Sequence, residues 1–140
     1  MAFREKSAWV MALALLFGGA FYFYLVAQMS GAVGALAPPL VPTLVGYTVL
    51  MVVIAVVGHV LAAVTAPRDA AAPEDERDRQ IVHRAGHLSS YVLAVGVVLA
   101  LGGYLVTRDG DLLFYAVFGS LMLGSLVEYL TQIYLYRRGG

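Results

Sequence analysis

The sequence predicts an all-α membrane protein whose four transmembrane helices form two hairpins. Hydrophobic residues make up 61% of the chain and charged residues 13%, compared with roughly 25% charged residues in soluble domains. Segments 7–67 and 85–107 contain no Asp, Glu, Lys or Arg. Because about 20 apolar residues cross the hydrocarbon core of a bilayer, the first segment is long enough for two spans and the second for one. A soluble domain of 140 residues could not bury this much apolar surface.

Residues 7–28 form the first predicted span. Arg4 and Lys6 precede it, as basic residues precede the apolar stretch of a secretory signal. The stretch is longer than the roughly 7 to 15 apolar residues of a signal, and it closes with the aromatic cluster 21–24 instead of a small-residue cleavage site. We therefore predict an uncleaved span, with the aromatic cluster at the membrane interface.

Residues 42–65 form the second predicted span. The Gly- and Pro-rich segment 29–41 predicts a turn before it, and Pro42 suits the first turn of a helix. Pro67 is expected to end this span, because proline breaks a helix interior. Residues 66–80 then make up a linker and a helical extension outside the membrane.

The third and fourth predicted spans are residues 81–106 and 112–136. The charged segment 74–79 runs into the third span without Gly or Pro, which predicts one long helix whose first turns lie in water. Acidic residues at its start suit the positive end of a helix dipole. Segment 108–111 is predicted to be a tight polar turn between the two spans.

The basic residues predict the orientation of the spans, because cytoplasmic loops of membrane proteins carry an excess of Lys and Arg. One side of the predicted spans carries eight of the nine: Arg4, Lys6, Arg68, Arg77, Arg79, Arg84, Arg137 and Arg138. The other side carries Arg108. We therefore expect both termini and the linker in the cytoplasm, an N-in, C-in arrangement.

The candidate site residues are the few ionisable ones inside or at the edge of the spans: His59, His83, His87 and Glu128. An ionisable side chain in lipid is costly and is by default a functional hypothesis. At a rise of ~1.5 Å per residue, His59, His87 and Glu128 lie ~9 to ~12 Å inside the cytoplasmic ends of their spans. Glu128 also continues a ridge of small residues at i+4 spacing, which is typical of a packing face.

Three functions compete with a purely structural role for these residues. In a metal site, His83 and His87 share an ion suited to zinc, iron or copper. The remaining ligands would be His59 and either Glu128 or Glu76. In a haem site, two of the histidines are axial ligands; in a proton or ion path, Glu128 exchanges a proton with a histidine. In the structural role, a neighbouring carbonyl, side chain or headgroup satisfies each polar group.

The composition and motifs argue against an enzyme. The chain contains no cysteine, which excludes disulfide exchange, thiolate metal sites and iron–sulfur clusters. The sequence has no serine–histidine–acid set, phosphate-binding loop or HExxH motif. We therefore expect a non-enzymatic accessory, regulatory or sensor subunit that needs no cofactor. The alternative is a small transporter or a metal- or haem-binding protein built on His59, His87 and Glu128.

The charged start of the third helix is the candidate contact surface for a cytoplasmic protein partner: Asp75, Glu76, Arg77, Asp78 and Arg79. Charge runs at helix starts are usually solvated faces. Five acids against four bases over residues 68–84 argue against a polybasic lipid-binding patch. Besides the lipid bilayer, a homodimer is a candidate partner, because four short spans enclose little interior. No nucleic-acid partner is expected.

The segment from Asp75 to Ile81, which reads Asp-Glu-Arg-Asp-Arg-Gln-Ile, resembles a motif of small bacterial inner-membrane proteins with no assigned activity. Segments 84–87 and 90–93 continue the resemblance. Those proteins have four predicted spans, with the charged motif leading into the third, and segment 134–138 is similar to their usual ending. The resemblance implies a bacterial inner-membrane location and carries no activity or site residue with it.

Overall fold

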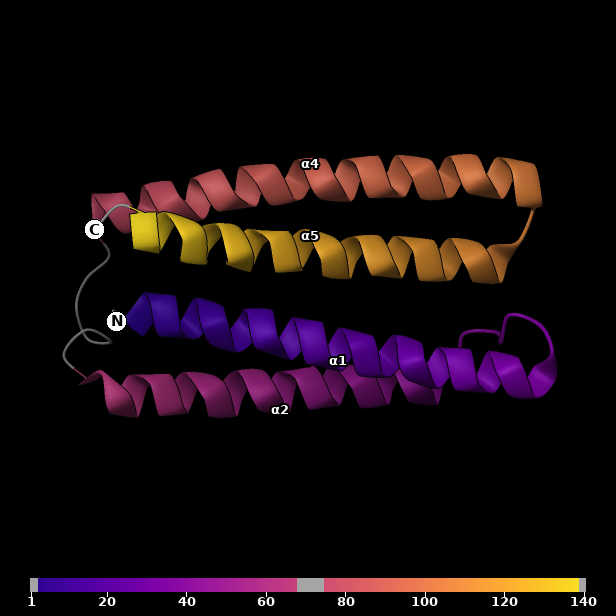
Figure 1. The fold of residues 1–140 in the computed structure, drawn as a ribbon, viewed down its shortest axis with the longest axis horizontal. Coiled ribbons are helices and arrows are strands. Elements are labelled where there is room, and N and C mark those ends of the chain that lie inside the picture. Colours follow the sequence, from indigo (N-terminus) through magenta and orange to yellow (C-terminus); the bar gives the residue numbers. More distant parts are fainter. Residues whose placement is uncertain (1–2, 68–74, 139–140) are drawn as a thin grey trace.

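The computed structural model of the chain describes residues 3–67 and 75–138. Four long helices account for most of them, which confirms the all-α prediction: α1 (Phe3–Val33), α2 (Val41–Thr65), α4 (Glu76–Thr107) and α5 (Gly110–Arg138). Each of the four is long and apolar enough to cross a membrane. They run as two antiparallel hairpins, α1 with α2 and α4 with α5 (Figure 1).

The first hairpin differs from the prediction at its turn, because α1 continues through residues 29–33. The Ser30 hydroxyl donates to the Val26 carbonyl at 2.8 Å, a bond within the helix. The turn begins at Gly34, whose φ of +74° suits glycine, and its N–H closes the helix on the Ser30 carbonyl at 2.9 Å. The predicted proline in the first turn of α2 is confirmed at Pro42.

The second hairpin has a shorter turn than the predicted segment 108–111. Arg108 ends α4 in the left-handed region, with φ of 57°, and its N–H bonds the Tyr104 carbonyl at 2.8 Å. The Asp109 carboxylate accepts the N–H groups of Asp111 and Leu112 at 2.9 and 3.0 Å, as an N-cap does. Gly110 therefore already belongs to α5. The prediction of one long helix into the third span is confirmed from Glu76 onward.

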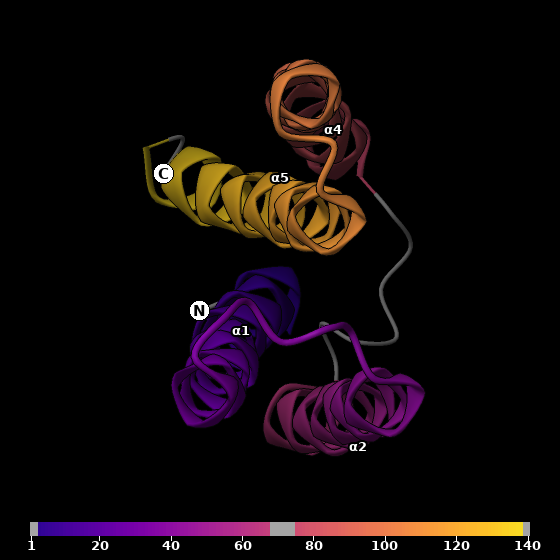
Figure 2. The same cartoon turned by 90° about the vertical axis from the view of Figure 1, so that its right-hand side faces the viewer.

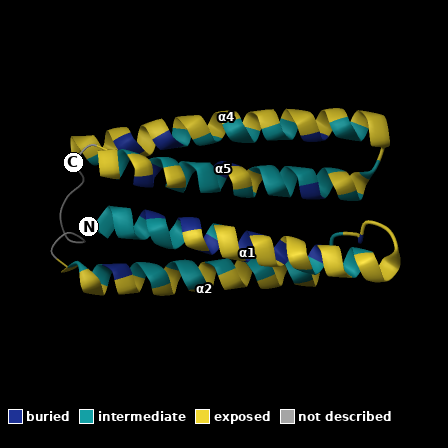
Figure 3. Ribbon diagram, viewed as in Figure 1, coloured by how far each residue is buried: buried dark blue, intermediate teal, exposed yellow. Residues whose placement is uncertain are grey.

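The four helices pack as an open row in the order α2, α1, α5, α4 (Figure 2). Helix α1 contacts α2 and α5, and α5 contacts α4. Among the described residues, α2 and α4 have no packing contact with each other. These two helices therefore form the outer members of the row, and much of their surface is exposed (Figure 3).

Small residues let α4 and α5 approach closely. A Cβ atom placed on Gly96 would lie 2.4 Å from the Ser120 Oγ, and one on Gly124 would lie 3.4 Å from the Ser89 carbonyl oxygen. The ridge predicted on the fourth span therefore packs against α4 at Ser120 and Gly124. Close approach of small residues is how helices associate in lipid, where hydrophobic burial supplies no driving force between them.

Candidate functional site

The structure does not bring the predicted site residues together. His59 lies on α2, His83 and His87 lie on α4, and Glu128 lies on α5. Helices α1 and α5 stand between α2 and α4 in the row (Figure 2). Within residues 3–67 and 75–138, no three His, Asp or Glu side chains are grouped so that they could hold a metal ion. The similar depth predicted for these residues is therefore not accompanied by proximity in the fold.

His59 forms a hydrogen-bonded link between α2 and α1. Its Nδ1 lies 2.6 Å from the Ala55 carbonyl oxygen, and its Nε2 lies 2.6 Å from the Ser7 hydroxyl. A carbonyl only accepts, so Nδ1 carries a proton; in the neutral form of the ring, Nε2 then accepts from the Ser7 hydroxyl. In a catalytic triad a carboxylate accepts from Nδ1 of the histidine, whereas here a backbone carbonyl accepts. This arrangement matches the structural role predicted for His59, in which neighbouring groups satisfy its hydrogen bonds.

Glu128 has a local partner on its own helix. Its Oε1 accepts a hydrogen bond of 3.3 Å from the Gln132 side-chain amide, four residues later. The Gln132 side chain is polar but buried, with a relative exposure of 8%. Glu128 itself is half-buried. The pair therefore satisfies polar groups within α5, and its geometry does not include a histidine.

His83 and His87 lie on the outer face of α4, the side turned away from α5. Both side chains are exposed, and the His87 ring makes an edge-on contact with the Tyr91 ring at 5.3 Å between centroids. Tyr91 is 62% exposed. These residues thus share one face of α4, and that face points out of the row. Figure 3 shows the exposed surface that continues along this helix.

Three consecutive residues at the start of α1 each contact a different helix. The Arg4 guanidinium lies 2.9 Å from the Asp78 carboxylate of α4, and the Glu5 carboxylate lies 3.2 Å from the Arg137 guanidinium of α5. The Lys6 ammonium donates to the hydroxyl of Thr65 at the end of α2, at 3.2 Å. Of the predicted partner-contact residues, Asp78 is therefore engaged within the chain.

An aromatic cluster joins α1, α2 and α5 at the end opposite these charges. Tyr22 is 2% exposed, and its ring lies 5.3 Å from that of Tyr47 and 4.9 Å from that of Phe118. The prediction of an interfacial belt is wrong for Tyr22, because this face of α1 packs against two helices; Phe21 and Tyr24 remain exposed. Nothing in the local sequence distinguishes Tyr22 from its aromatic neighbours.

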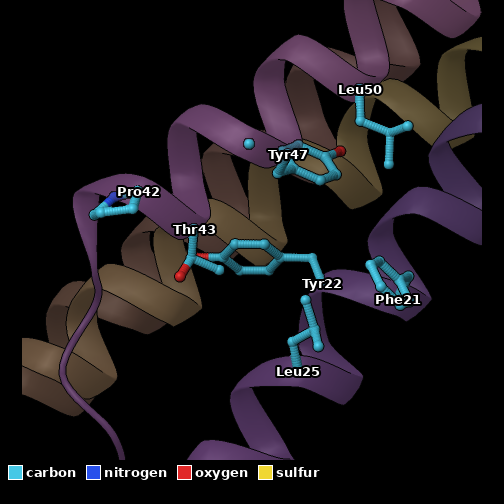
Figure 4. Close-up of a pocket in the computed structure, with 8 residues that line it drawn as sticks. Phe21, Tyr22, Leu25, Pro42, Thr43, Tyr47 and Leu50 are labelled. Carbon is cyan, nitrogen blue, oxygen red and sulfur yellow. The ribbon is translucent and has the colours of Figure 1, made fainter.

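A cavity of about 370 Å³ opens beside this cluster between α1 and α2. Figure 4 shows residues that line it: Phe21, Tyr22, Leu25, Pro42, Thr43, Tyr47 and Leu50. The lining is apolar except for three hydroxyl-bearing side chains. It has no ionisable group that titrates near neutral pH and offers no set of metal ligands.

No protein-family model, no curated protein and no solved structure matches this chain. The likeness of residues 75–81 to a motif of bacterial inner-membrane proteins therefore stays a prediction.

Proposed function

We propose that the chain is a non-enzymatic accessory subunit of the bacterial inner membrane, with both termini in the cytoplasm. In this proposal it acts by packing the outer face of α4 against a transmembrane helix of a larger membrane-protein partner. The bias of basic residues toward one side of the spans supports the orientation. The exposed polar residues of α4 support the mode of action.

The observation that carries the proposal is the exposure of His87 within an apolar segment. His87 lies six residues after Ile81, ~9 Å along the helix axis. Ionisable residues at membrane depth almost always face the interior of a bundle or a water-filled cavity. A partner helix on this face would remove His87 from lipid and supply a hydrogen-bonding group. Ser90 and Ala94 are small exposed residues on the same face, and small residues permit close helix approach.

Site-specific photocrosslinking tests this contact in cells that produce the chain at its normal level. A photoreactive amino acid at Ala94 reports on the outer face of α4, and one at Val53 reports on the exposed surface of α2, where the native side chain is 52% exposed. We expect a discrete adduct from position 94 and none from position 53. The variant His87→Leu should lose the adduct while its melting temperature is unchanged.

Three outcomes would contradict the proposal. Position 94 could give no adduct, or both positions could give the same smear of adducts, as free lipid-facing sites would. An adduct at twice the chain mass of 15.0 kDa would instead identify a second copy as the occupant. The orientation has its own test, because the chain contains no cysteine. A single cysteine at position 109 should react with a membrane-impermeant thiol reagent from the periplasm, and one at position 66 should not.

The transporter and metal- or haem-binding alternatives find no geometric support. They require His59, His87 and Glu128 to share a site, and the three lie on helices α2, α4 and α5 with separate partners. The accessory role is therefore the one function we propose.

A further inference from the structure

We propose that the groove between the cytoplasmic ends of α4 and α5 binds an anionic phospholipid, with the headgroup phosphate held by Arg77, Arg84 and Arg138. This inference concerns a different surface from the outer face of α4. It rests on a basic cavity, an apolar groove that continues it, and the placement of both at the membrane surface.

The headgroup end is a cavity of about 230 Å³ between the two helices. Residues from both helices line it: Arg77, Gln80, Ile81, Arg84, Leu135 and Arg138. The polar lining groups are three guanidinium groups and an amide, and no carboxylate is among them. Arginine forks match the oxygen geometry of phosphate and bind it in a bidentate manner.

The spacing along α4 explains why the cavity is basic although the segment as a whole is mixed in charge. Arg77, Ile81 and Arg84 are four and three residues apart, which places them on one side of a helix. Asp78 follows Arg77 directly in the sequence, but it does not line the cavity. Its carboxylate forms an ion pair with the Arg4 guanidinium at 2.9 Å. Five acids against four bases over residues 68–84 argued against a lipid patch, yet helical geometry separates the bases from their acidic neighbours.

The three arginines are available to an anion to different degrees. Within the described residues, the side chains of Arg77 and Arg84 form no hydrogen bond or ion pair. Arg138 is held over the Tyr134 ring, 5.5 Å from its centroid, and donates to the Tyr134 hydroxyl. That contact uses one nitrogen of the guanidinium and positions the group at the rim of the cavity.

The apolar end is a second cavity, of about 450 Å³, that shares Arg84 and Leu135 with the first. Its lining continues along both helices: Arg84, Leu88, Val127, Leu130, Thr131, Tyr134 and Leu135. From Val127 to Leu135 the apolar lining follows nine residues of α5, ~12 Å of helix. One leaflet of hydrocarbon is about half of the ~30 Å core of a bilayer. The apolar groove therefore extends over most of the thickness of one leaflet, and the arginines lie at its headgroup end.

The occupant follows from this combination. A soluble phosphate would use the basic cavity alone, and an uncharged lipid would use the apolar groove alone. A phospholipid with net negative charge uses both, and basic pockets between transmembrane helices on the cytoplasmic side are known to take such headgroups.

Native mass spectrometry of the purified full chain tests the proposal, with dioleoyl phosphatidylglycerol and dioleoyl phosphatidylcholine as probes. We expect the anionic lipid to be retained preferentially. Arg84→Gln should weaken its binding about five-fold, the fold-change for one arginine near an anionic surface. The triple variant Arg77→Gln/Arg84→Gln/Arg138→Gln should lose the preference. The matched control is Arg79→Gln, which removes one charge from the same part of α4 outside the groove.

Two further measurements separate a bound lipid from a bound anion. Leu130→Trp leaves all three arginines in place and narrows the apolar groove. It should therefore weaken the binding of dioleoyl phosphatidylglycerol, whose long acyl chains use the groove, and leave the binding of dihexanoyl phosphatidylglycerol unchanged. Inorganic phosphate should displace the lipid only at millimolar or higher concentration. The proposal is overturned if Arg79→Gln weakens binding as much as Arg84→Gln, if the two dioleoyl lipids bind equally, or if inorganic phosphate competes as well as the lipid. A melting temperature measured for each variant shows that it is folded.

Discussion

The two hairpins have the same topology and a similar apolar composition, but their helices meet in different ways. In the second hairpin, Gly96 faces Ser120 and Gly124 faces Ser89, so backbones approach closely over a long interface. In the first hairpin, hydrogen bonds from Ser7 and Lys6 reach α2 at one end, and aromatic rings fill the other. Close packing and interhelical hydrogen bonds both associate helices in lipid. The first hairpin also has close glycine contacts, since a Cβ on Gly58 would lie 2.2 Å from the Val10 Cγ1. It therefore combines close packing with hydrogen bonds and aromatic contacts.

The largest effect should come from breaking the close packing at Gly96. In Gly96→Ala, the new Cβ would lie 2.4 Å from the Ser120 Oγ and 2.7 Å from the Ser120 Cβ. Overpacking of this kind costs about 1–3 kcal/mol. We expect the free energy of unfolding, measured by SDS titration in mixed micelles, to fall by this amount.

The control for Gly96 is Gly103 on the same helix, where a Cβ would meet nothing within 4 Å. Gly103→Ala should raise stability by roughly 0.5–1 kcal/mol, because alanine is the better helix former. Combining Gly96→Ala with Ser120→Gly exchanges the small residue across the interface and should restore much of the loss. If Gly96→Ala and Gly103→Ala change stability alike, close packing does not hold α4 to α5.

A smaller loss is expected where the two hairpins are joined at the loop. The Tyr115 hydroxyl of α5 donates to the Ala37 carbonyl at 3.1 Å, and both residues are buried. Tyr115→Phe should cost about 1 kcal/mol, the usual contribution of one such hydrogen bond. Hydrogen exchange should accelerate in segment 34–40 while the helix centres keep their protection. Tyr24→Phe, at a side chain with 58% exposure, is the control and should change neither.

The hydrogen bond between Ser7 and His59 should contribute less. Double-mutant cycles on interhelical hydrogen bonds in membrane proteins average about 0.6 kcal/mol. A cycle with Ser7→Ala and His59→Leu should give a coupling energy of this size. A coupling near zero would mean that the 2.6 Å contact between Nε2 and Oγ adds nothing beyond packing, and the contrast between the hairpins would then rest on the aromatic cluster.

The smallest effect should come from the ion pair of Glu5 with Arg137. The Arg137 side chain is 60% exposed, and exposed ion pairs contribute about 0–1 kcal/mol. We expect Glu5→Gln to lower stability by ~0.5 kcal/mol at low ionic strength and to have no effect in ~1 M salt, where the Debye length is ~3 Å. A loss that persists at high salt would point to packing of Glu5 rather than its charge.

The sequence was sufficient to predict the helices and insufficient to predict their neighbours. Charge-free segments predict four spans, because the cost of a charge in lipid acts on each residue independently of the rest of the fold. The end of α1 was predicted too early, since Gly31 is tolerated in a helix and the break waits for the positive φ of Gly34. The order of the helices in the row depends on tertiary packing. No local sequence pattern predicts that α1 and α5 lie between α2 and α4.

The same reason explains which site residues were found and which were missed. Depth is predicted by counting residues along a helix, and the similar depth of His59, His87 and Glu128 stays a prediction. Their partners depend on which helices adjoin. Ser7, fifty-two residues from His59, carries no sequence signal for that contact. The basic groove was missed because charges were counted along the chain rather than around the helix.

The contacts of Arg4, Glu5 and Lys6 have a consequence for the order in which the molecule is completed. Translation delivers their partners one at a time, Thr65 first, Asp78 next and Arg137 last of the three. The Glu5 pair spans 132 positions of the chain. Only a chain that extends through Arg137 can close all three contacts, so the first turn of α1 is held in place late in folding.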